Sequence, residues 1–415
     1  MTSVFELPPT AGLPLRLSDL VGHGENLGNA VSVLLGTPRM QYECSGTVCL
    51  LIALLTLRRR EPKRDHVIVP AYTCPLVVMA IQQAGLQTVV CDVRNGHFDF
   101  DIEHLVILVN ERTLVVLPTH LGGRIADVSA AVAVARKFGT YVIEDAAQAL
   151  GARQQGRSVG LIGDIGFFSL AAGKGLTTYE GGLLLTHDDQ LREELAGTSA
   201  GLLKNQPGWE FRRTLEMVGY GICYRPLLLG TVYGWPRRRD LDRGDLVAAV
   251  GDCFHFNFPR HPAGRWRGVV AARASRRLPA FIQSCSAQAG RRIAQLRRIE
   301  GIEVMNDAPG EGVGTWPMLM IVMANQDSRD RALQRLWRSP LGVTRLFIHA
   351  LPDYPELADR FVGADVPNAR DLASRILTVT NSLWLDDDHF ETIASTLSEV
   401  AAIARKSHHD HRLDT

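Results

Sequence analysis

The feature that most limits the possible folds is the alternation of short apolar stretches with stretches of helical spacing between residues 67 and 145. We expect strands at residues 67–70, 88–91, 114–118 and 140–143, and helices at 76–83 and 125–138. Short apolar strands that alternate with helices predict an α/β fold in which a mostly parallel sheet is flanked by helices. Ligands of such sheets bind beyond the carboxyl ends of the strands. Asp145 stands at the end of the last of these strands, where a ligand is expected.

The length of 415 residues predicts more than one simple core. Residues 1–40 are rich in Pro and Gly, and we expect them to form an irregular N-terminal arm. A large domain is predicted at 41–250, a smaller C-terminal α+β domain at 251–405 and a tail at 406–415. The α+β prediction rests on strands at 318–323 and 343–348 and on helices at 327–337, 368–377 and 387–404.

Composition and charge exclude several classes of protein. The formal net charge is +1, so no bulk field favours binding to nucleic acid or to a membrane surface. The seven cysteines are scattered, odd in number and without a C-x-x-C pair, which fits a reducing cytoplasm better than a disulfide framework or a zinc site. The first 14 residues lack a basic start followed by an apolar core, so we expect no signal peptide and a cytoplasmic location.

Two segments allow more than one interpretation. Residues 217–235 are apolar but carry Arg225 and Pro226 near their middle, and a central charge is costly inside a bilayer. A buried or interface segment is therefore favoured, while the neighbouring arginines 237–239 leave contact with a membrane surface open. The histidines of the tail resemble a metal site, but a solvated tail is favoured because no framework would orient the ligands.

Two further stretches could hold a cofactor. Lys174 lies in a run of small residues, where its amine could form a Schiff base with a carbonyl cofactor if burial or a cation kept it partly neutral. The alternative is an ordinary solvated lysine in a surface turn. Ser45, Gly46 and Thr47 precede an apolar helix at 48–57. They could bind an anion or only cap the helix, and the local residues favour the cap.

Several motifs occur in a fixed order along the chain: Ser45-Gly46-Thr47, then residues 67–73, 118–127, 143–152, 163–169 and 174–182. Together they resemble the DegT/DnrJ/EryC1/StrS family of sugar aminotransferases that depend on pyridoxal 5′-phosphate (PLP), over about residues 43–188. The resemblance implies a fold type I PLP-dependent transferase with a large PLP-binding domain and a small C-terminal domain. It also implies a homodimer whose active sites lie at the subunit interface.

The resemblance also implies a role for individual residues. Lys174 takes the Schiff-base position and then moves a proton between substrate and cofactor. Asp145 stands beside the pyridine nitrogen, where its charge favours a protonated ring. Gln148 lies near the ring and its O3′ atom. The residues implied to hold the phosphate are Gly46, Thr47 and Ser169, so the resemblance reverses the preference for a plain cap.

Two departures from the family pattern stand out. Cys74 occupies the position of an aromatic residue that usually stacks on the cofactor, and Asn257-Phe258-Pro259-Arg260 is only a weak match to the loop that reaches the partner's phosphate.

The function implied by the resemblance is transfer of an amino group from an amino acid, expected to be L-glutamate, to a keto sugar. We expect that sugar to be nucleotide-linked and to serve polysaccharide or natural-product biosynthesis. The alternatives are another PLP reaction on a sugar, such as dehydration, and a non-catalytic binding protein.

Overall fold

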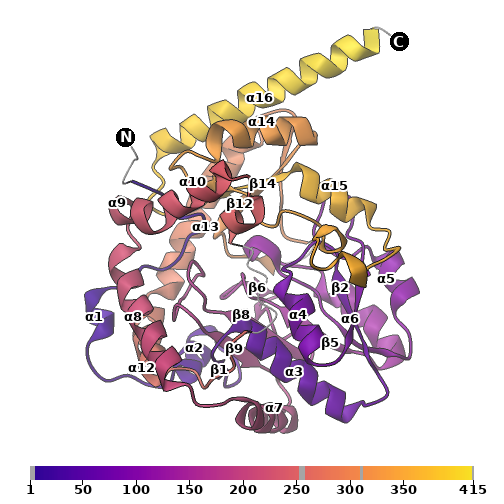
Figure 1. Cartoon of the computed structure of the whole chain (residues 1–415), viewed down its shortest axis with the longest axis vertical. Coiled ribbons are helices and arrows are strands. Elements are labelled where there is room, and N and C mark those ends of the chain that lie inside the picture. The colour runs from indigo at the N-terminus through magenta and orange to yellow at the C-terminus, as the bar shows by residue number, and fades with distance from the viewer. Residues whose placement is uncertain (1–4, 252–257, 309–311, 414–415) are drawn as a thin grey trace.

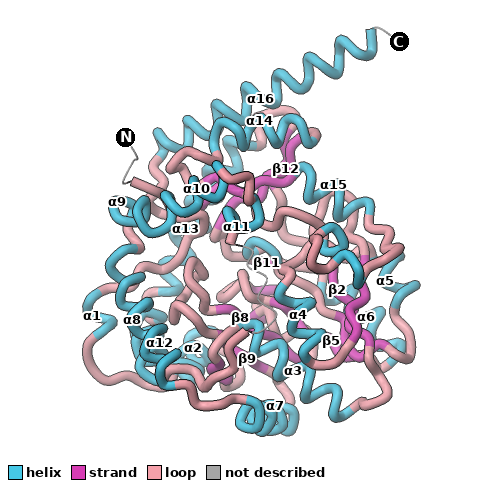
Figure 2. Tube along the Cα trace, viewed as in Figure 1, coloured by secondary structure: helices cyan, strands magenta, loops and turns pink. Residues whose placement is uncertain are grey.

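A seven-stranded sheet forms the centre of the larger part of the chain (Figures 1 and 2). The computed structural model describes residues 5–251, 258–308 and 312–413. The strand order is β1-β9-β8-β5-β4-β2-β3. The pairs β2–β3, β2–β4, β4–β5 and β5–β8 are parallel, whereas β9 runs antiparallel to both of its neighbours. The predicted mostly parallel sheet is therefore confirmed. The strands are β1 (Gln41–Glu43), β2 (His66–Pro70), β3 (Gln87–Cys91), β4 (Thr113–Val116), β5 (Tyr141–Asp145), β8 (Ile165–Ser169) and β9 (Gly182–Leu185).

Helices connect the parallel strands, and their apolar residues form the main core with the sheet. Side-chain caps set where several of them begin. Asp101 accepts hydrogen bonds from two amides at the start of α5, and Asp127 accepts one from Ala130 at the start of α6, so α6 begins later than the predicted residue 125. The helices of this part are α3 (Gly46–Arg60), α4 (Leu76–Gln83), α5 (Ile102–Leu108), α6 (Val128–Ala135) and α7 (Asp189–Leu202).

The C-terminal part is built on an antiparallel sheet of order β10-β12-β14-β13. Its helices pack their apolar faces on this sheet to form a second core, and α16 extends beyond the body of the molecule (Figure 1). The elements are α13 (Leu278–Leu296), β10 (Ile302–Val304), β12 (Met318–Met323), α14 (Gln326–Leu336), β13 (Val343–Thr344), α15 (Pro367–Arg375), β14 (Ile376–Thr380) and α16 (Asp387–Leu413). A small sheet of β11 (Gly312–Val313), β6 (Arg153–Gln154) and β7 (Arg157–Ser158) links the two parts.

Two details of the sequence prediction are wrong. The helix predicted at 368–377 ends at Arg375, because Ile376 and Leu377 already pair with β12 as the start of β14. The strand predicted at 343–348 is only the two-residue β13. The backbone of α16 continues to Leu413, and the side chains from residue 406 onward, where a tail is predicted, lie outside the described part.

The N-terminal arm joins the two parts of the molecule. Its backbone bonds to Pro340 and Pro317 of the C-terminal part through Leu7 and Ala11, and to Gly175 of the large part through Leu13. The expectation of an irregular arm is wrong for the stretch that forms α1 (Leu17–Leu20) and α2 (Leu27–Leu35). The second helix starts at a side-chain cap from Asn26 and ends at Gly36, whose φ of 65° suits glycine.

The segment 217–235 spans parts of several helices, because Pro226 begins a new helix after a break at Tyr224 and Arg225. Within the described residues, no helix is both long enough and apolar enough to cross a bilayer. Arg237 is 4% exposed and bonded to Glu6, so it is not available to a membrane surface. The helices of this region are α8 (Pro207–Cys223), α9 (Pro226–Leu229), the π-helix η3 (Gly230–Gly234), α10 (Trp235–Asp242), α11 (Leu246–Val250) and α12 (Arg265–Ser275).

Candidate active site

A cavity of about 370 Å³ lies at the carboxyl ends of β5 and β8, beside the N-terminus of α3. This is the edge of the sheet where ligands of parallel α/β proteins bind. The structure brings all of the predicted site residues to this cavity: Gly46, Thr47, Asp145, Gln148, Ser169 and Lys174. They come from three separate stretches of the chain, so their meeting is a property of the fold.

The N-terminus of α3 forms one wall of the cavity. The Ser45 hydroxyl accepts a hydrogen bond from Val48 at 3.1 Å, so Ser45 caps the helix as its sequence predicted. Gly46 and Thr47 line the cavity. A Cβ atom at Gly46 would lie 3.2 Å from the Cβ of Ser169, so glycine keeps the helix start close to the end of β8. Free amides at a helix N-terminus bind anions, and this wall suits a phosphate.

Lys174 lies in the loop of residues 170–181 that joins β8 to β9. Three backbone hydrogen bonds of 2.8–3.0 Å close this loop on itself, and Tyr179 has a φ of 66° that only a well-fixed turn maintains. Lys174 is partly buried. The loss of water around its amine lowers the Lys174 pKa, against the opposing effects of Cys74 and Asp145. The loop therefore presents an amine that loses its proton more readily than a solvated lysine does.

Asp145 ends β5 and is buried. Its main chain bonds to Pro118 and His120, and its Oδ1 accepts a hydrogen bond from the Ala147 amide at 3.0 Å. Burial raises the Asp145 pKa, while the Ala147 bond and the nearby Lys174 and His120 oppose that rise. A cationic group placed in the cavity would stabilise the charged carboxylate.

A hydrogen bond from the backbone fixes the side chain of Gln148. Its Oε1 accepts a hydrogen bond from the Gly122 amide at 2.7 Å. The acceptor of the side-chain amide is thereby engaged, which leaves the NH₂ group as the donor that can serve the cavity.

Sequence reasoning did not single out the buried pair of His120 and Glu144. The Nδ1 atom of His120 accepts a hydrogen bond from Ala126, so its Nε2 carries the proton and donates to Glu144 at 3.0 Å. Glu144 also accepts from three backbone amides of the loop before β8, those of Gly160, Ile162 and Gly163, at 2.5–2.7 Å. The sequence marks this pair only through two adjacent acidic residues, Glu144 and Asp145, on a strand that is otherwise apolar. Neighbouring residues of a strand point to opposite faces of the sheet, so Glu144 points away from the face of Asp145.

A second group of residues missed from the sequence fastens the lysine loop to α8. Glu180 near the loop's end accepts a hydrogen bond from Trp209 Nε1 at 3.0 Å and forms an ion pair with Arg213 at 2.8 Å. Arg267 of α12 donates to the carbonyl of Thr178 at 2.9 Å. Trp209, Arg213 and Arg267 follow the lysine loop in the sequence, and no sequence motif marks them.

The two departures from the family pattern have different outcomes. Cys74 lines the cavity, and so does Phe347 from the C-terminal part, whose ring meets Tyr72 edge-on at 5.6 Å between centroids. An aromatic side chain therefore reaches the cavity wall from a distant part of the sequence. The weak loop match begins at Asn257, which lies outside the described residues.

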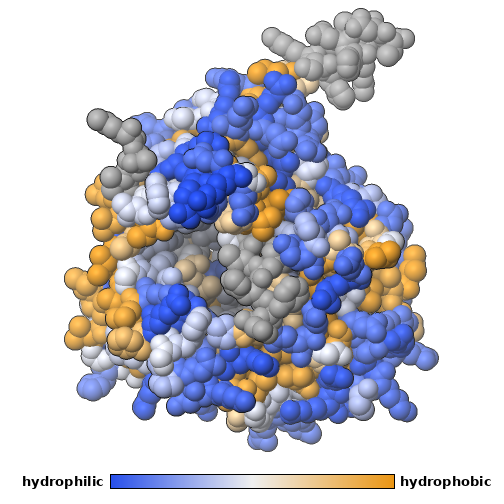
Figure 3. All heavy atoms as spheres, viewed as in Figure 1, coloured by the Kyte–Doolittle hydropathy of each residue, from blue (hydrophilic) through white to orange (hydrophobic). Residues whose placement is uncertain are grey.

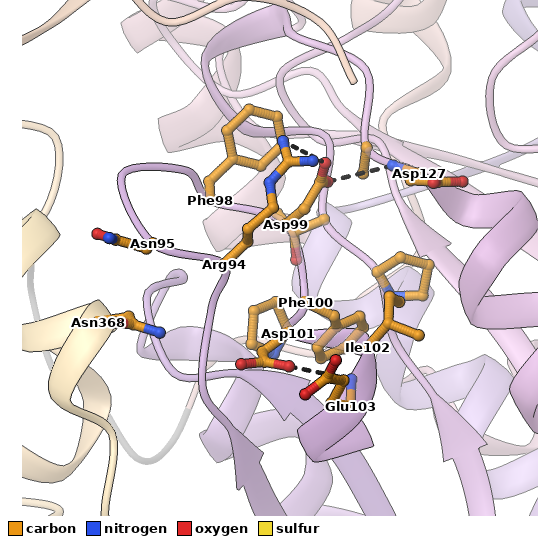
Figure 4. A pocket seen from close by; sticks show the side chains of 14 residues that line it. Arg94, Asn95, Phe98, Asp99, Phe100, Asp101, Ile102, Glu103, Asp127 and Asn368 are labelled. Carbon is orange, nitrogen blue, oxygen red and sulfur yellow. Dashed lines mark hydrogen bonds and ion pairs between the residues drawn. The ribbon is translucent and has the colours of Figure 1, made fainter. Parts of the chain in front are cut away.

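A second pocket of about 350 Å³ adjoins the cavity and shares Thr119 with it (Figure 4). Three of its four carboxylates, those of Asp99, Asp101 and Asp127, are engaged in the fold. Asp101 and Asp127 cap helices α5 and α6, and Asp99 Oδ1 accepts from the Asp127 amide at 3.1 Å while Arg94 lies within 3.8 Å of Oδ2. We assign this pocket a structural role.

Comparisons with known proteins agree with the geometry. Residues 25–222 match the model described as the DegT/DnrJ/EryC1/StrS aminotransferase family. One relative is a UDP-N-acetyl-3-dehydro-α-D-glucosamine 3-aminotransferase from Acidithiobacillus ferrooxidans, 34% identical over 213 residues that cover 48% of this chain and 56% of the relative. A GDP-perosamine synthase from Caulobacter vibrioides is 36% identical over 151 residues, which cover 36% of this chain and 40% of that protein. The chain thus matches about half or less of the length of these relatives.

A solved structure extends the likeness of fold to nearly the whole chain. The PLP form of a putative sugar aminotransferase from Streptococcus pneumoniae is 18% identical, with a TM-score of 0.69, and the match covers 96% of this chain and 99% of that one. The predicted fold type I architecture is confirmed. That solved structure is a PLP form, and the cavity of this chain fits the same cofactor: an amine, a buried carboxylate and an anion-binding helix start surround one space.

Proposed function

We propose that this chain, whose residues 25–222 match the DegT/DnrJ/EryC1/StrS aminotransferase family, is a PLP-dependent aminotransferase that moves an amino group from an amino acid to a keto sugar. The observation that carries the proposal is that Lys174 and Asp145 line one cavity together with Ser169 and the N-terminus of α3. A phosphorylated pyridine aldehyde needs an amine, a carboxylate and an anion site in this close arrangement.

Bound PLP would supply the electron sink that takes up the electron pair released when a substrate C–H bond breaks. Lys174 would hold the cofactor by its aldehyde and afterwards carry a proton on Nζ between two carbon atoms. Asp145 would face the ring nitrogen, and Gln148 would donate from its NH₂ group to the ring oxygen. The phosphate would be held by the α3 amides, Thr47 and Ser169.

The electrostatics of the cavity suit these roles. The lowered Lys174 pKa increases the share of neutral amine, which is the form that attacks a carbonyl and accepts a proton. Burial raises the Asp145 pKa, so a further positive charge beside the carboxylate would stabilise its charged form. A protonated ring nitrogen would provide that charge and would in turn be kept protonated by it.

The proposal has a finer part that names the substrates. We take L-glutamate as the amino donor and a nucleotide-linked keto sugar as the acceptor, in polysaccharide or natural-product biosynthesis. The activities named for the two relatives, one a UDP-sugar aminotransferase and one a GDP-perosamine synthase, support a nucleotide-linked acceptor. The resemblance supports a homodimer, and we include one in the proposal.

The two half-reactions test the proposal separately. L-Glutamate should convert the PLP-loaded protein to the pyridoxamine form, which is seen as loss of visible absorbance. A screen of keto-sugar nucleotides with isotopically labelled glutamate should then place the label in one product. A product that has lost an oxygen without gaining an amine would instead indicate dehydration. If no amino donor changes the absorbance, the aminotransferase proposal is wrong and a binding protein is favoured.

A further inference from the structure

Helix α8 has two faces of opposite character. Its inner face carries the groups that fasten the lysine loop, together with the fully buried Met217 and with Tyr220, which stacks on Tyr224. Its outer face exposes large apolar side chains to solvent, as do the neighbouring α1 and α9 and the start of α10. These exposed residues are Leu17, Val21, Phe211, Leu215, Ile222, Leu227, Leu228, Val232 and Trp235, and we call them the apolar face.

The apolar face is continuous on one side of the molecule. Figure 3 shows hydrophobic residues gathered along the margin where Figure 1 places α1, α8 and α9. Three of its residues are mostly uncovered, because Leu17 is 76% exposed, Val21 is 73% exposed and Leu227 is 70% exposed. Contiguous apolar surface of this kind marks a site of interaction with a protein or a membrane.

A basic pocket of about 640 Å³ lies beside this face. Four arginines line it, and none of its lining residues is acidic. Arg16 directly precedes α1 and Arg225 directly precedes α9, so the exposed apolar residues Leu17 and Leu227 lie one and two residues along the chain from arginines of the pocket. The other two arginines are Arg276 and Arg277.

Most of this positive charge is not neutralised by the protein. Arg277 pairs with Asp19, whereas Arg225 donates to the carbonyls of Leu15 and Tyr224 at 2.7–2.8 Å. Arg16 and Arg276 form no salt bridge with any described residue, and both are exposed. Three guanidinium groups therefore converge on one pocket without a carboxylate partner, which favours an anionic ligand.

We propose that the apolar face docks on an anionic phospholipid surface, with lipid phosphates held in the pocket of Arg16, Arg225, Arg276 and Arg277. Apolar side chains that rim a cluster of arginines are the pattern of proteins that bind at the bilayer interface without crossing it. A second copy of the same face is disfavoured, because a two-fold contact would bring the two arginine clusters toward each other. A small free anion would fill the pocket but would leave the apolar residues uncovered.

Co-sedimentation with vesicles tests this proposal on the full chain loaded with PLP. Vesicles of equal parts phosphatidylcholine and phosphatidylglycerol should bind the protein, and vesicles of phosphatidylcholine alone should not. Each arginine near an anionic surface contributes about fivefold to binding, so Arg16→Gln with Arg276→Gln should weaken it roughly 20-fold. Leu17→Ser with Leu227→Ser should weaken it about tenfold or more by removing buried apolar area.

Matched controls use residues of the same type elsewhere on the surface. Ile107→Ser with Val362→Ser removes two equally exposed apolar groups, and Arg298→Gln removes an exposed arginine outside the pocket. These variants should bind as the wild type does, and all variants should keep the PLP absorbance because none lines the cofactor cavity. Equal binding to neutral vesicles would overturn the proposal, as would unchanged binding by both test pairs. Light scattering that showed dimers lost on Leu17→Ser with Leu227→Ser would assign the face to a second copy instead.

Discussion

Two ionisable side chains in the cofactor cavity are less readily charged than they would be in water. Burial lowers the Lys174 pKa and raises the Asp145 pKa, so each side chain loses its charge more readily than it would in water. Both shifts lower the free energy of unfolding of the cofactor-free protein. Bound PLP would relieve them, because its aldehyde would hold the lysine amine and its protonated ring nitrogen would place a cation beside the aspartate. Shifted pKa values of this kind, which lower the stability of the fold, are typical of functional sites.

The Lys174 shift predicts how stability depends on pH. Below the ordinary lysine pKa of about 10.4, the unfolded chain holds a proton on Lys174 more tightly than the folded chain does. The unfolded state then binds more protons, so the free energy of unfolding rises with pH toward that value. Lys174→Met should remove this contribution and stabilise the cofactor-free protein, most strongly near neutral pH.

Urea unfolding of both proteins across that pH range measures the effect. The difference in free energy of unfolding should shrink as the pH rises, while Lys137→Met, at an exposed lysine, should show no such trend. A Lys174→Met protein that is less stable than the wild type at neutral pH would show that the lysine is well paired, against this account.

Glu144 should contribute strongly to stability although it takes no part in the chemistry. Its buried carboxylate accepts hydrogen bonds from three backbone amides and from His120. In Glu144→Gln, the new side-chain NH₂ group would face N–H groups that now donate to the carboxylate, so at least one buried N–H group would lose its acceptor. One such unsatisfied buried group costs about 1–3 kcal/mol. We expect the free energy of unfolding in urea to fall by about 2–4 kcal/mol, given the charge involved. Glu111→Gln at an exposed site is the control, and an equal effect of the two substitutions would contradict the role given to Glu144.

At the scale of elements, the start of α3 depends on a close approach to β8. A methyl group at residue 46 would lie 3.2 Å from Ser169 Cβ and would push the helix start away from the phosphate-binding position. We predict that Gly46→Ala weakens PLP binding about tenfold, the equivalent of one good charge-assisted hydrogen bond, and leaves folding nearly unchanged. Absorbance titration of the cofactor-free protein measures this. Gly197→Ala in α7, where no atom lies within 4 Å of the added carbon, should bind PLP as the wild type does. If both variants bound PLP with equal affinity, the start of α3 would not form part of the phosphate-binding site.

Helix α8 is predicted to support the lysine loop through its inner face. Arg213→Met breaks the ion pair with Glu180 and should loosen the loop, which weakens PLP affinity by roughly three- to tenfold. Arg212→Met is the matched control on the same helix, because that arginine is exposed and forms its ion pair with Glu216 at 3.0 Å and not with Glu180 of the lysine loop. Fluorescence titration with PLP compares the two. If Arg212→Met lost more PLP affinity than Arg213→Met, the outer face of α8 and not its inner face would support the lysine loop, against this prediction.

Much of the fold could be predicted because its elements carry their own local signals. Strands β2 to β5 are short apolar runs bounded by turns, and the cap at Ser45 marks the start of α3. The end of α15 could not be placed, because Ile376 and Leu377 continue the helical spacing and become strand only by pairing with β12. The ion pair of Arg213 with the lysine loop and the position of Phe347 at the cavity wall could not be predicted either, because both depend on contacts between segments that are distant in the sequence. The domain boundaries and the roles of the six site residues remain predictions.

At the scale of the whole molecule, the cofactor cavity is enclosed by parts that the sequence places far apart. The central sheet supplies Asp145 and Ser169, the loop between two of its strands supplies Lys174, and the C-terminal part supplies Phe347. The N-terminal arm crosses from one part to the other and bonds to the lysine loop, where the Thr10 hydroxyl donates to the Gly173 carbonyl at 2.5 Å. Activity should therefore require the intact chain.

The most direct test of the central claim is chemical trapping of PLP on the protein. The chain has five lysines, at positions 63, 137, 174, 204 and 406. Borohydride reduction of the PLP-loaded protein, followed by peptide mass spectrometry, shows which amine held the cofactor. We predict a stoichiometric label on Lys174 alone, and a much weaker one when Asp145→Ala removes the carboxylate. A label spread over the other lysines, or one that ignores Asp145, would contradict the account.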